Sequence, residues 1–282
     1  MGQSIEHWVV FSSPAGSTRR VAEVAAIKLR DCGQEVRTFD LGEPMARRQL
    51  RELALNRPDR LCLWVGTPVY VLHPVPPVMA ELASLPIKAG DTAVPFVTWG
   101  GVSSGVALYE LGKFLQERGC CLIGAAKVLA EHSSLWRSPR PLGAGHPDRG
   151  DATKIRFLVD NVLERLGLEP EGGVELSRLS YQPENIQTEA ASKNLIEARP
   201  LFPDFRVDLD RCDRCQECVN NCPAGAISWE GQPRFGEGCF LCLKCIRSCP
   251  QQAIPIDYSG MEQRIVGQAR INQEKPGTRI FY

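Results

Sequence analysis

A cysteine pattern near the C-terminal end of the chain occurs twice, at a constant offset of 27 residues. The two runs consist of Cys212, Cys215, Cys218 and Cys222, and of Cys239, Cys242, Cys245 and Cys249. Each run has the spacing C-x2-C-x2-C-x3-C-P, which is typical of segments that ligate 4Fe–4S clusters. Because two such clusters need eight thiolates, the pattern predicts a small domain that folds around two clusters.

In this spacing, the fourth cysteine of each run ligates the cluster of the other run. We therefore expect cluster one to be held by Cys212, Cys215, Cys218 and Cys249, and cluster two by Cys239, Cys242, Cys245 and Cys222. The exchange links the two halves, so cluster binding and folding should be coupled. Two weaker interpretations are zinc, which usually needs C-x2-C pairs separated by a longer spacer, and clusters with a purely structural role.

The other composition features exclude several classes of protein. Basic and acidic residues number 33 each, so the net charge of zero gives no argument for a nucleic-acid partner. The N-terminal segment carries Glu6 and only a short apolar run, unlike a signal peptide, and no stretch reaches the ~18 apolar residues of a membrane span. We expect a cytoplasmic location without a membrane span, and buried, unligated side chains for the other four cysteines, Cys32, Cys62, Cys120 and Cys121.

Residues 1–167 alternate between apolar runs of strand length and amphipathic stretches of helix length. Strands are expected at 7–11, 35–40, 61–66, 93–99 and 120–129, and helices at 17–32, 77–84, 106–118 and 153–167. The third strand is a near-continuous apolar run, as expected for a parallel strand that is covered on both faces. The alternation predicts an α/β doubly wound five-stranded parallel sheet.

Changes in amino-acid composition after residue 167 divide the rest of the chain into segments. We expect a domain at 1–167, a linker at 168–203, a small α+β cysteine domain at 204–258 and a polar tail at 259–282. The linker is rich in Pro, Glu, Gly and Ser, with one short helix near 189–197. It either wraps one domain or permits movement, and both alternatives stay open.

A loop of small and hydroxyl-bearing residues follows the first strand and leads into the first helix. Unpaired amides and the helix dipole at such a position favour an anion. The loop has no lysine after Gly16, as a nucleotide-binding P-loop would, and no dinucleotide fingerprint. It is either a single phosphate cradle or a plain strand-to-helix turn. The candidate phosphate ligands are Ser12, Ser13, Ala15, Gly16, Ser17 and Thr18.

Two further loops should reach the same edge of the sheet, where ligands bind in open α/β folds. Their candidate residues are Thr67, Pro68, Val69 and Tyr70 after the third strand, and Trp99, Gly100 and Gly101 after the fourth. Glycines let backbone approach a ring, and aromatic side chains can stack on it, which suits an isoalloxazine. Taken singly, however, Tyr70 and Trp99 are more often core or surface residues.

Residues 1–167 resemble flavodoxin, which binds FMN through a T-x-T-G-x-T loop after its first strand. Ser13, Gly16 and Thr18 match that loop, whereas Pro14 and Ala15 stand where donors are usual, and proline has no N–H. The cysteine domain resembles a bacterial-type two-cluster ferredoxin. Taken together, the two ends of the chain resemble the flavodoxin–ferredoxin fusion proteins of anaerobic bacteria and archaea, and the resemblance does not cover the linker at 168–203 or the tail. It implies FMN in addition to two 4Fe–4S clusters.

These features predict an electron-transfer protein that passes low-potential electrons between the two clusters, FMN and redox partner proteins. On this prediction the protein is more a carrier than an enzyme, and no catalytic residue is assigned. The alternative is a flavin-dependent oxidoreductase that acts on a small molecule such as a quinone, with His73 or His132 as acid or base. A redox or iron sensor is a third class, but no DNA-binding motif supports it.

Overall fold

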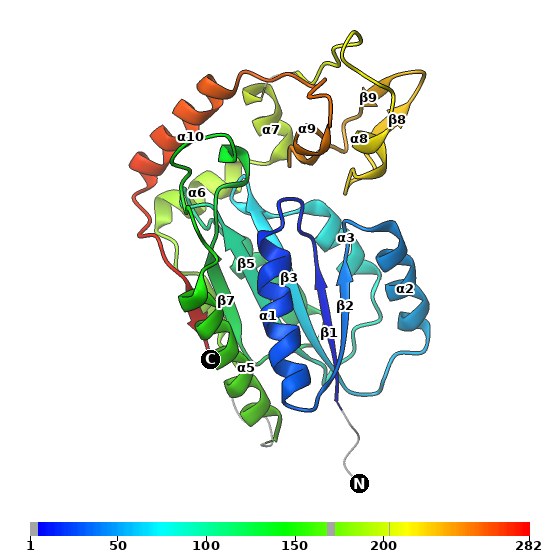
Figure 1. The fold of residues 1–282 in the computed structure, drawn as a ribbon. Helices are drawn as coiled ribbons and strands as arrows, with labels where there is room; N and C mark the ends of the chain where they lie inside the picture. Colours follow the sequence, from blue (N-terminus) through cyan, green and yellow to red (C-terminus); the bar gives the residue numbers. More distant parts are fainter. Residues whose placement is uncertain (1–4, 168–172, 203) are drawn as a thin grey trace.

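The computed structural model describes residues 5–167, 173–202 and 204–282. Its larger part is a sheet with helices on both faces, and the cysteine domain lies beyond the carboxyl ends of the strands (Figure 1). The loops predicted to bind a cofactor end at this same edge of the sheet. The two halves of the chain therefore meet where the sequence places their cofactors.

Five parallel strands form the sheet in the order β2-β1-β3-β5-β7. They are β1 (Glu6–Phe11), β2 (Glu35–Asp40), β3 (Leu61–Tyr70), β5 (Thr92–Trp99) and β7 (Ala125–Leu129). This is the strand order of the flavodoxin-like sheet, in which ligands bind at the switch point between β1 and β3. The order confirms the predicted doubly wound sheet. Two short strands, β4 (His73–Pro74) and β6 (Cys121–Leu122), pair with β3 and β5, so the predicted strand at 120–129 is divided.

The helices cover the sheet in two layers (Figure 1). The helices α1 (Ser17–Asp31) and α5 (Arg149–Gly167) pack on one face, and α2 (Pro44–Leu55), α3 (Pro76–Ser84) and α4 (Ala107–Glu117) pack on the other. The helix α2 was not predicted from the sequence. Only Leu50 and Ala54 of that helix are buried, so its apolar face is narrow.

The segments predicted as linker and tail are largely ordered elements. The first contains η2 (Leu176–Leu179), α6 (Glu184–Ser192), α7 (Leu195–Ala198) and η3 (Arg199–Leu201). The second forms α10 (Tyr258–Asn272) and β10 (Arg279–Phe281), which pairs antiparallel with β7 as an edge strand of the sheet. Phe281 is fully buried and stacks on Tyr181 at 5.7 Å between ring centroids. The chain thus returns to the α/β domain after the cysteine domain.

The cysteine domain is a small α+β unit, as predicted. It contains α8 (Glu217–Asn220), a hairpin of β8 (Ile227–Trp229) and β9 (Pro233–Phe235), and α9 (Lys244–Ser248). Its apolar core includes Ile227, Ile246 and Ile254, together with Met261 from α10. The tail helix therefore completes the core of this domain before the chain reaches the sheet.

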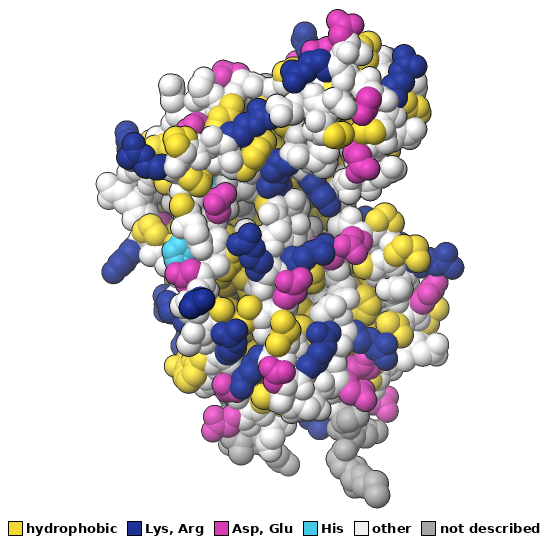
Figure 2. Space-filling model, in the orientation of Figure 1, with side chains coloured by type: hydrophobic (Ala, Val, Ile, Leu, Met, Phe, Trp, Pro, Cys, Tyr) yellow, Lys and Arg dark blue, Asp and Glu magenta, His cyan; other side chains and the backbone are white. Residues whose placement is uncertain are grey.

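Charge and hydropathy give little indication of partners. Figure 2 shows basic and acidic side chains interspersed over the visible face, in keeping with the zero net charge. None of the helices in the described ranges is both long enough and apolar enough to cross a bilayer.

Candidate cofactor sites

The fold brings each fourth cysteine to the other run. A small cavity is lined by the predicted ligands of cluster one, Cys212, Cys215, Cys218 and Cys249. The predicted ligands of cluster two are also neighbours, because the Cys222 thiol lies within electrostatic range of Cys239, Cys242 and Cys245. This arrangement supports the predicted exchange of ligands between the two runs.

The spacing of the sulfur atoms is wider than a single zinc ion needs. In the described ranges, the one set of three candidate metal ligands within 4.8 Å of one another is His146, Asp148 and Asp151, and none of the cysteine sets qualifies. Tetrahedral zinc with Zn–S bonds of ~2.3 Å would hold its sulfurs about 3.8 Å apart. The geometry therefore favours a multi-iron cluster over zinc.

The turns between the cysteines repeat an uncommon backbone conformation. Arg214 and Gln216 both have φ of 62°, and Leu241 and Leu243, 27 residues later, have φ of 61° and 58°. Such left-handed residues create concavities of amide groups that bind anions, including iron–sulfur clusters. The Leu241 amide donates to Cys239 Sγ at 3.4 Å. Each left-handed non-glycine residue costs on the order of 1 kcal/mol of conformational free energy, and cluster binding would offset that cost.

The two cluster sites differ in exposure. Cys242 and Cys245 are each only 8% exposed, whereas Cys215 is exposed. Cys242 and the neighbouring Phe240 belong to the same apolar core as the strands of the sheet. Burial raises the pKa of Cys242 to about 12, so cluster assembly must displace a proton from it. Cluster two therefore lies at the interface with the α/β domain, and cluster one lies farther out.

Two arginine side chains join the domains through proline carbonyls. Arg247, on α9, donates to the Pro14 carbonyl at 2.9 Å, and its guanidinium lies 5.5 Å from the Trp136 ring. Arg47, on α2, donates to the Pro223 carbonyl, which directly follows Cys222. Pro14 offers no N–H to a phosphate, but its carbonyl anchors the cysteine domain on the predicted phosphate loop.

Tyr70 lies between cluster two and the edge of the sheet. Its ring centroid is 5.9 Å from that of Phe240, which lies between Cys239 and Cys242 in the sequence. Its hydroxyl is buried and has no hydrogen-bond partner among the described residues. Burial raises the pKa of Tyr70 to about 12, so this hydroxyl is neutral at physiological pH. It is an uncharged, unpartnered donor beside the predicted flavin loops.

The predicted phosphate loop is an uncharged anion cradle. Gly16 has φ of 92°, and Ser13 Oγ accepts the Arg19 amide at 2.9 Å, which caps the third residue of α1. The amides of Ser17 and Thr18 have no acceptor in the described part of the chain. The Arg19 guanidinium binds Asp40 at 2.8 Å and is thereby directed to a carboxylate. Helix amides, not a cation, would therefore bind a phosphate.

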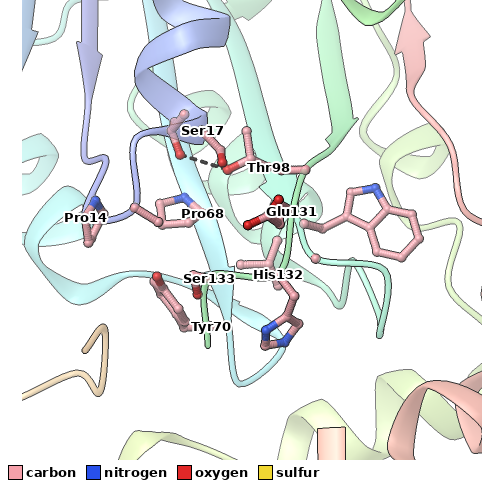
Figure 3. Close-up of a pocket in the computed structure, with 14 residues that line it drawn as sticks. Pro14, Ser17, Pro68, Tyr70, Thr98, Glu131, His132 and Ser133 are labelled. Carbon is pink, nitrogen blue, oxygen red and sulfur yellow. Dashed lines mark hydrogen bonds between the residues drawn. The ribbon is translucent and has the colours of Figure 1, made fainter. Parts of the chain in front are cut away.

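A cavity of about 50 Å³ lies at the meeting point of the three predicted loops and the loop after β7 (Figure 3). The lining residues that the sequence predicts are Ala15, Ser17, Thr18, Pro68, Val69, Tyr70, Trp99 and Gly100, and the further ones are Pro14, Thr98, Ala130, Glu131, His132 and Ser133. Figure 3 shows Tyr70 and His132 on opposite sides of the cavity, at the end away from Ser17. The fourth loop was not predicted to bind the cofactor, although His132 in it was considered as an acid or base near the flavin.

Several predicted ligands do not line this cavity. Ser12 is fully buried, and its hydroxyl has no partner among the described residues. Thr67 Oγ1 accepts the Val75 amide at 3.0 Å, which fixes the turn after β3. Gly101 has φ of 77° and shapes the loop after β5. Trp99 does line the cavity, but its indole is buried, donates to the Gly277 carbonyl at 3.3 Å and lies 4.9 Å from Lys127 Nζ, so most of its ring packs in the core.

The two histidines considered as acid or base have different surroundings. His132 borders the cavity, and its Nδ1 accepts the Ser134 amide at 3.2 Å, at the start of η1 (Ser133–Leu135). Burial lowers the pKa of His132 to about 4, so the ring is neutral and its Nε2 carries the proton. His73 instead bonds Glu110 at 2.9 Å and the Lys193 carbonyl at 2.8 Å, and it ties the linker to the α/β domain.

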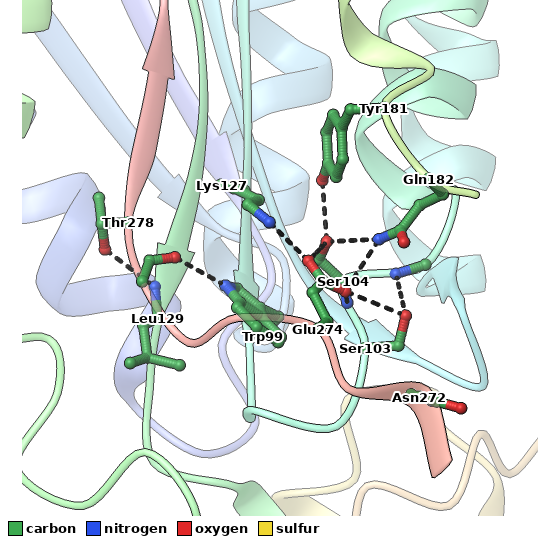
Figure 4. A network of polar contacts seen from close by, with 12 residues as sticks. Trp99, Ser103, Ser104, Lys127, Leu129, Tyr181, Gln182, Asn272, Glu274 and Thr278 are labelled. Carbon is green, nitrogen blue, oxygen red and sulfur yellow. Dashed lines mark hydrogen bonds and ion pairs between the residues drawn. The ribbon is translucent and has the colours of Figure 1, made fainter. Parts of the chain in front are cut away.

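The loop after β5 is fixed by a residue of the tail (Figure 4). Glu274 accepts the Ser104 amide at 2.7 Å and the Gln182 amide at 2.9 Å, and it pairs with Lys127 at 2.5 Å. Glu274 and Lys127 are 12% and 11% exposed. Burial opposes ionisation of Glu274, but its bonds to Lys127, Ser104 and Gln182 lower its pKa below the usual range. The tail thus holds a predicted cofactor loop in place.

Comparisons with known families agree with the cluster sites. Residues 205–228 and 236–258 each match a 4Fe–4S binding domain family, and each segment contains one complete cysteine run. The protein therefore carries two 4Fe–4S binding segments. None of the curated proteins matches the chain.

Among solved structures, the chain is similar to rubredoxin oxygen:oxidoreductase from Desulfovibrio gigas, at 17% identity, with 58% of this chain and 37% of that chain covered and a TM-score of 0.46. It is also similar to a flavodoxin from Archaea, at 16% identity, 58% and 99% coverage and a TM-score of 0.43. A third is Flavodoxin 2 from Bacillus cereus, at 18% identity, 57% and 99% coverage and a TM-score of 0.43. The chain spans little more than a third of the Desulfovibrio protein.

These likenesses are too distant to assign a ligand or an activity. The strand order of the sheet and the two matched segments define the architecture independently. The protein joins a doubly wound α/β domain with the strand order β2-β1-β3-β5-β7 to a C-terminal domain that carries two 4Fe–4S binding segments.

Proposed function

We propose that the protein is an electron relay in which cluster one, cluster two and FMN lie in that order along one chain. The observation that carries the proposal is the position of cluster two. Its predicted ligand Cys242 is buried in the α/β core, and the adjoining Phe240 contacts Tyr70, which lines the cavity between the predicted FMN loops. Cluster two is therefore the cluster nearer to a bound flavin.

The residues at the sheet edge fit FMN. The free amides of Ser17 and Thr18 suit its phosphate, and the buried hydroxyls of Ser12 and Tyr70 lack partners among the described residues. The cavity of about 50 Å³ accommodates a phosphate group, so the ring would lie along the loops after β3 and β5. When bound, FMN supplies a site that exchanges electrons singly or in pairs.

Cluster one is the proposed exchange site for partner proteins. Its ligand Cys215 is exposed, and Cys212 and Cys249 are partly exposed. Electron transfer between proteins needs a short approach, which the exposed Cys215 would allow and the buried Cys242 and Cys245 of the second run would not. The partners are redox proteins that dock on this side of the ferredoxin domain.

Anaerobic reconstitution with iron, sulfide and FMN tests the relay. We expect about eight irons and one FMN per chain, and bleaching of the flavin when dithionite reduces the clusters. A chain that binds iron but takes up no flavin at saturating FMN would disprove the proposal that FMN is part of the relay.

A second candidate is an oxidoreductase that uses the relay to reduce a small molecule. The observation that favours it is a large groove that adjoins the cofactor cavity. The residues that line the groove indicate which class of ligand it could bind.

A further inference from the structure

An apolar groove of about 580 Å³ lies beside the cofactor cavity. The groove and the cavity share Val69, Gly100 and His132, so a ligand in the groove would adjoin a cofactor in the cavity. Its volume falls in the range of small-molecule sites, which is ~300–1,000 Å³. The linker helices α6 and α7 and the tail helix α10 form its outer walls, so it requires the segments that this chain adds to its sheet.

The walls are mainly aliphatic. Met261, Ile265 and Ile271 line the groove from α10, and Val71 and Leu72 line it from the turn after β3. Ile271 is 73% exposed, which is unusual for a large apolar side chain, and a bound apolar ligand would cover it.

A glycine in the middle of α10 keeps this space open. Gly267 lines the groove, and a Cβ built at this position would have no atom within 4 Å. Glycine weakens a helix interior relative to alanine, and nothing packs closely enough here to require it. Its effect in the folded protein is to leave room in front of the helix.

The opposite wall is a strained, firmly held turn. Val71 and Leu72 have φ of 49° and 71°, a conformation that β-branched and other bulky residues rarely adopt. The Val106 amide donates to the Leu72 carbonyl at 2.9 Å, and a Cβ on Gly105 would lie 2.2 Å from that carbonyl oxygen. Such strain persists where the surroundings fix it, often beside ligands. The groove is therefore bounded by a preformed surface.

Several polar groups line the groove, and two of them are free to define the chemistry of a ligand. At the end shared with the cofactor cavity, the neutral His132 ring has an Nε2–H to donate. At the other wall, Lys193 is paired with Glu189, and Glu197 accepts the Asn194 amide at 3.2 Å. Arg264, in contrast, is exposed and forms no salt bridge among the described residues. A matching ligand is an apolar ring with a carbonyl acceptor at one end and an anionic group at the other.

We propose that the groove binds an aromatic quinone with one anionic substituent and places it beside the flavin, a proposal that rests on the relay. A reduced flavin in the cavity would supply two electrons and two protons, so that a bound quinone would become the hydroquinone and the flavin would be oxidised. The residues of this chain orient the acceptor: His132 binds its carbonyl, Arg264 binds its anion, and the α10 wall covers its rings.

The test is calorimetric titration of the oxidised holoprotein with naphthoquinone sulfonate and with menadione, its neutral analogue, alongside single-turnover oxidation of the reduced protein. We expect saturable binding of both. Gly267→Leu should weaken both by roughly tenfold or more, by filling the groove, whereas Gly267→Ala should bind nearly as the wild type. Arg264→Ala should weaken only the sulfonate, by roughly fivefold, and Arg270→Ala, an exposed residue of the same helix outside the groove, should weaken neither.

Three outcomes would overturn the proposal. One is oxidation that rises linearly with quinone concentration and is equal in all variants, which means collision without a site. Another is undetectable binding by calorimetry. The third is loss of FMN from Gly267→Leu, which would make the groove the seat of the flavin ring itself. Titration of FMN-free protein keeps the two proposals separate: binding that responds to Gly267→Leu there supports the groove even if the relay fails.

Discussion

The α/β domain and the ferredoxin domain are stabilised by different means. The sheet is covered by helices on both faces, and large side chains such as Trp8, Trp64 and Phe96 are fully buried between the layers. The ferredoxin domain has a small apolar core that includes two of its own cysteines and borrows Met261 from α10. The first domain can fold by apolar burial alone, whereas the second depends on the metal.

The same contrast separates the two cysteine runs. They share one spacing and the same left-handed turns, but two cysteines of the second run, Cys242 and Cys245, are buried, whereas in the first run Cys218 is buried and Cys215 is exposed. In the proposed relay, one motif would supply both an inner cluster for the flavin and an outer cluster for partners. The position in the fold, not the motif, would then assign these roles.

The largest expected effect is that of iron removal. Anaerobic chelation should unfold the ferredoxin domain and leave the α/β domain folded, because only the former needs thiolate–iron bonds to hold its strained turns. Circular dichroism and thermal melting should show one remaining cooperative transition. If chelation unfolds the whole chain in one step, the two domains are not stabilised independently.

Removing one inner ligand should have the next largest effect. Cys245→Ser should reduce the iron content from about eight to about four per chain or fewer, since the buried site cannot replace the thiolate. Cys32→Ser, at an exposed cysteine outside the runs, is the control and should retain all the iron. Full iron loading of Cys245→Ser would remove that residue from the ligand set.

Breaking the buried pair of the tail should destabilise the α/β domain strongly. Glu274→Ala leaves Lys127 buried without its partner and should cost about 3–5 kcal/mol in free energy of unfolding. Glu52→Ala, which removes an exposed pair with Arg48, should leave the free energy of unfolding nearly unchanged in the same chemical denaturation. Equal costs for the two variants would mean that the tail contributes nothing through this pair.

The arginine contact between the domains should affect electron transfer more than folding. Arg247→Ala should slow flavin reduction by the clusters about tenfold, a barrier change of about 1.4 kcal/mol, with the iron and FMN contents unchanged. Arg234→Ala, at an exposed residue of the ferredoxin hairpin, is the matched control. An unchanged rate of flavin reduction in Arg247→Ala would show that this hydrogen bond does not keep cluster two and FMN close together.

The smallest effect concerns pH. Glu110 raises the pKa of His73 above its unfolded value, and the protonated ring donates to Glu110 and to the Lys193 carbonyl. The resulting stability is fully present below pH about 6.5 and is lost as the pH rises through the folded-state pKa. Unfolding free energies across this range should show the loss in the wild type and not in His73→Gln, and identical pH profiles would contradict this role.

The sequence predicted the parts of the molecule that depend on local spacing. The cysteine runs are fixed by cluster chemistry, and near-continuous apolar runs such as that of β3 identify buried parallel strands. The edge strand β10 was missed because it has only three residues, and its pairing with β7 brings together segments about 150 residues apart. The contact between Arg247 and Pro14 was missed for the same reason, since it joins residues 233 positions apart.

The measurement that tests the relay most directly is time-resolved absorbance of the holoprotein after a pulse that reduces the clusters. If cluster two and FMN are neighbours in one chain, the flavin should be reduced at a rate that does not change with protein concentration. A rate that rises in proportion to protein concentration would mean that electrons pass between molecules, and it would contradict the relay.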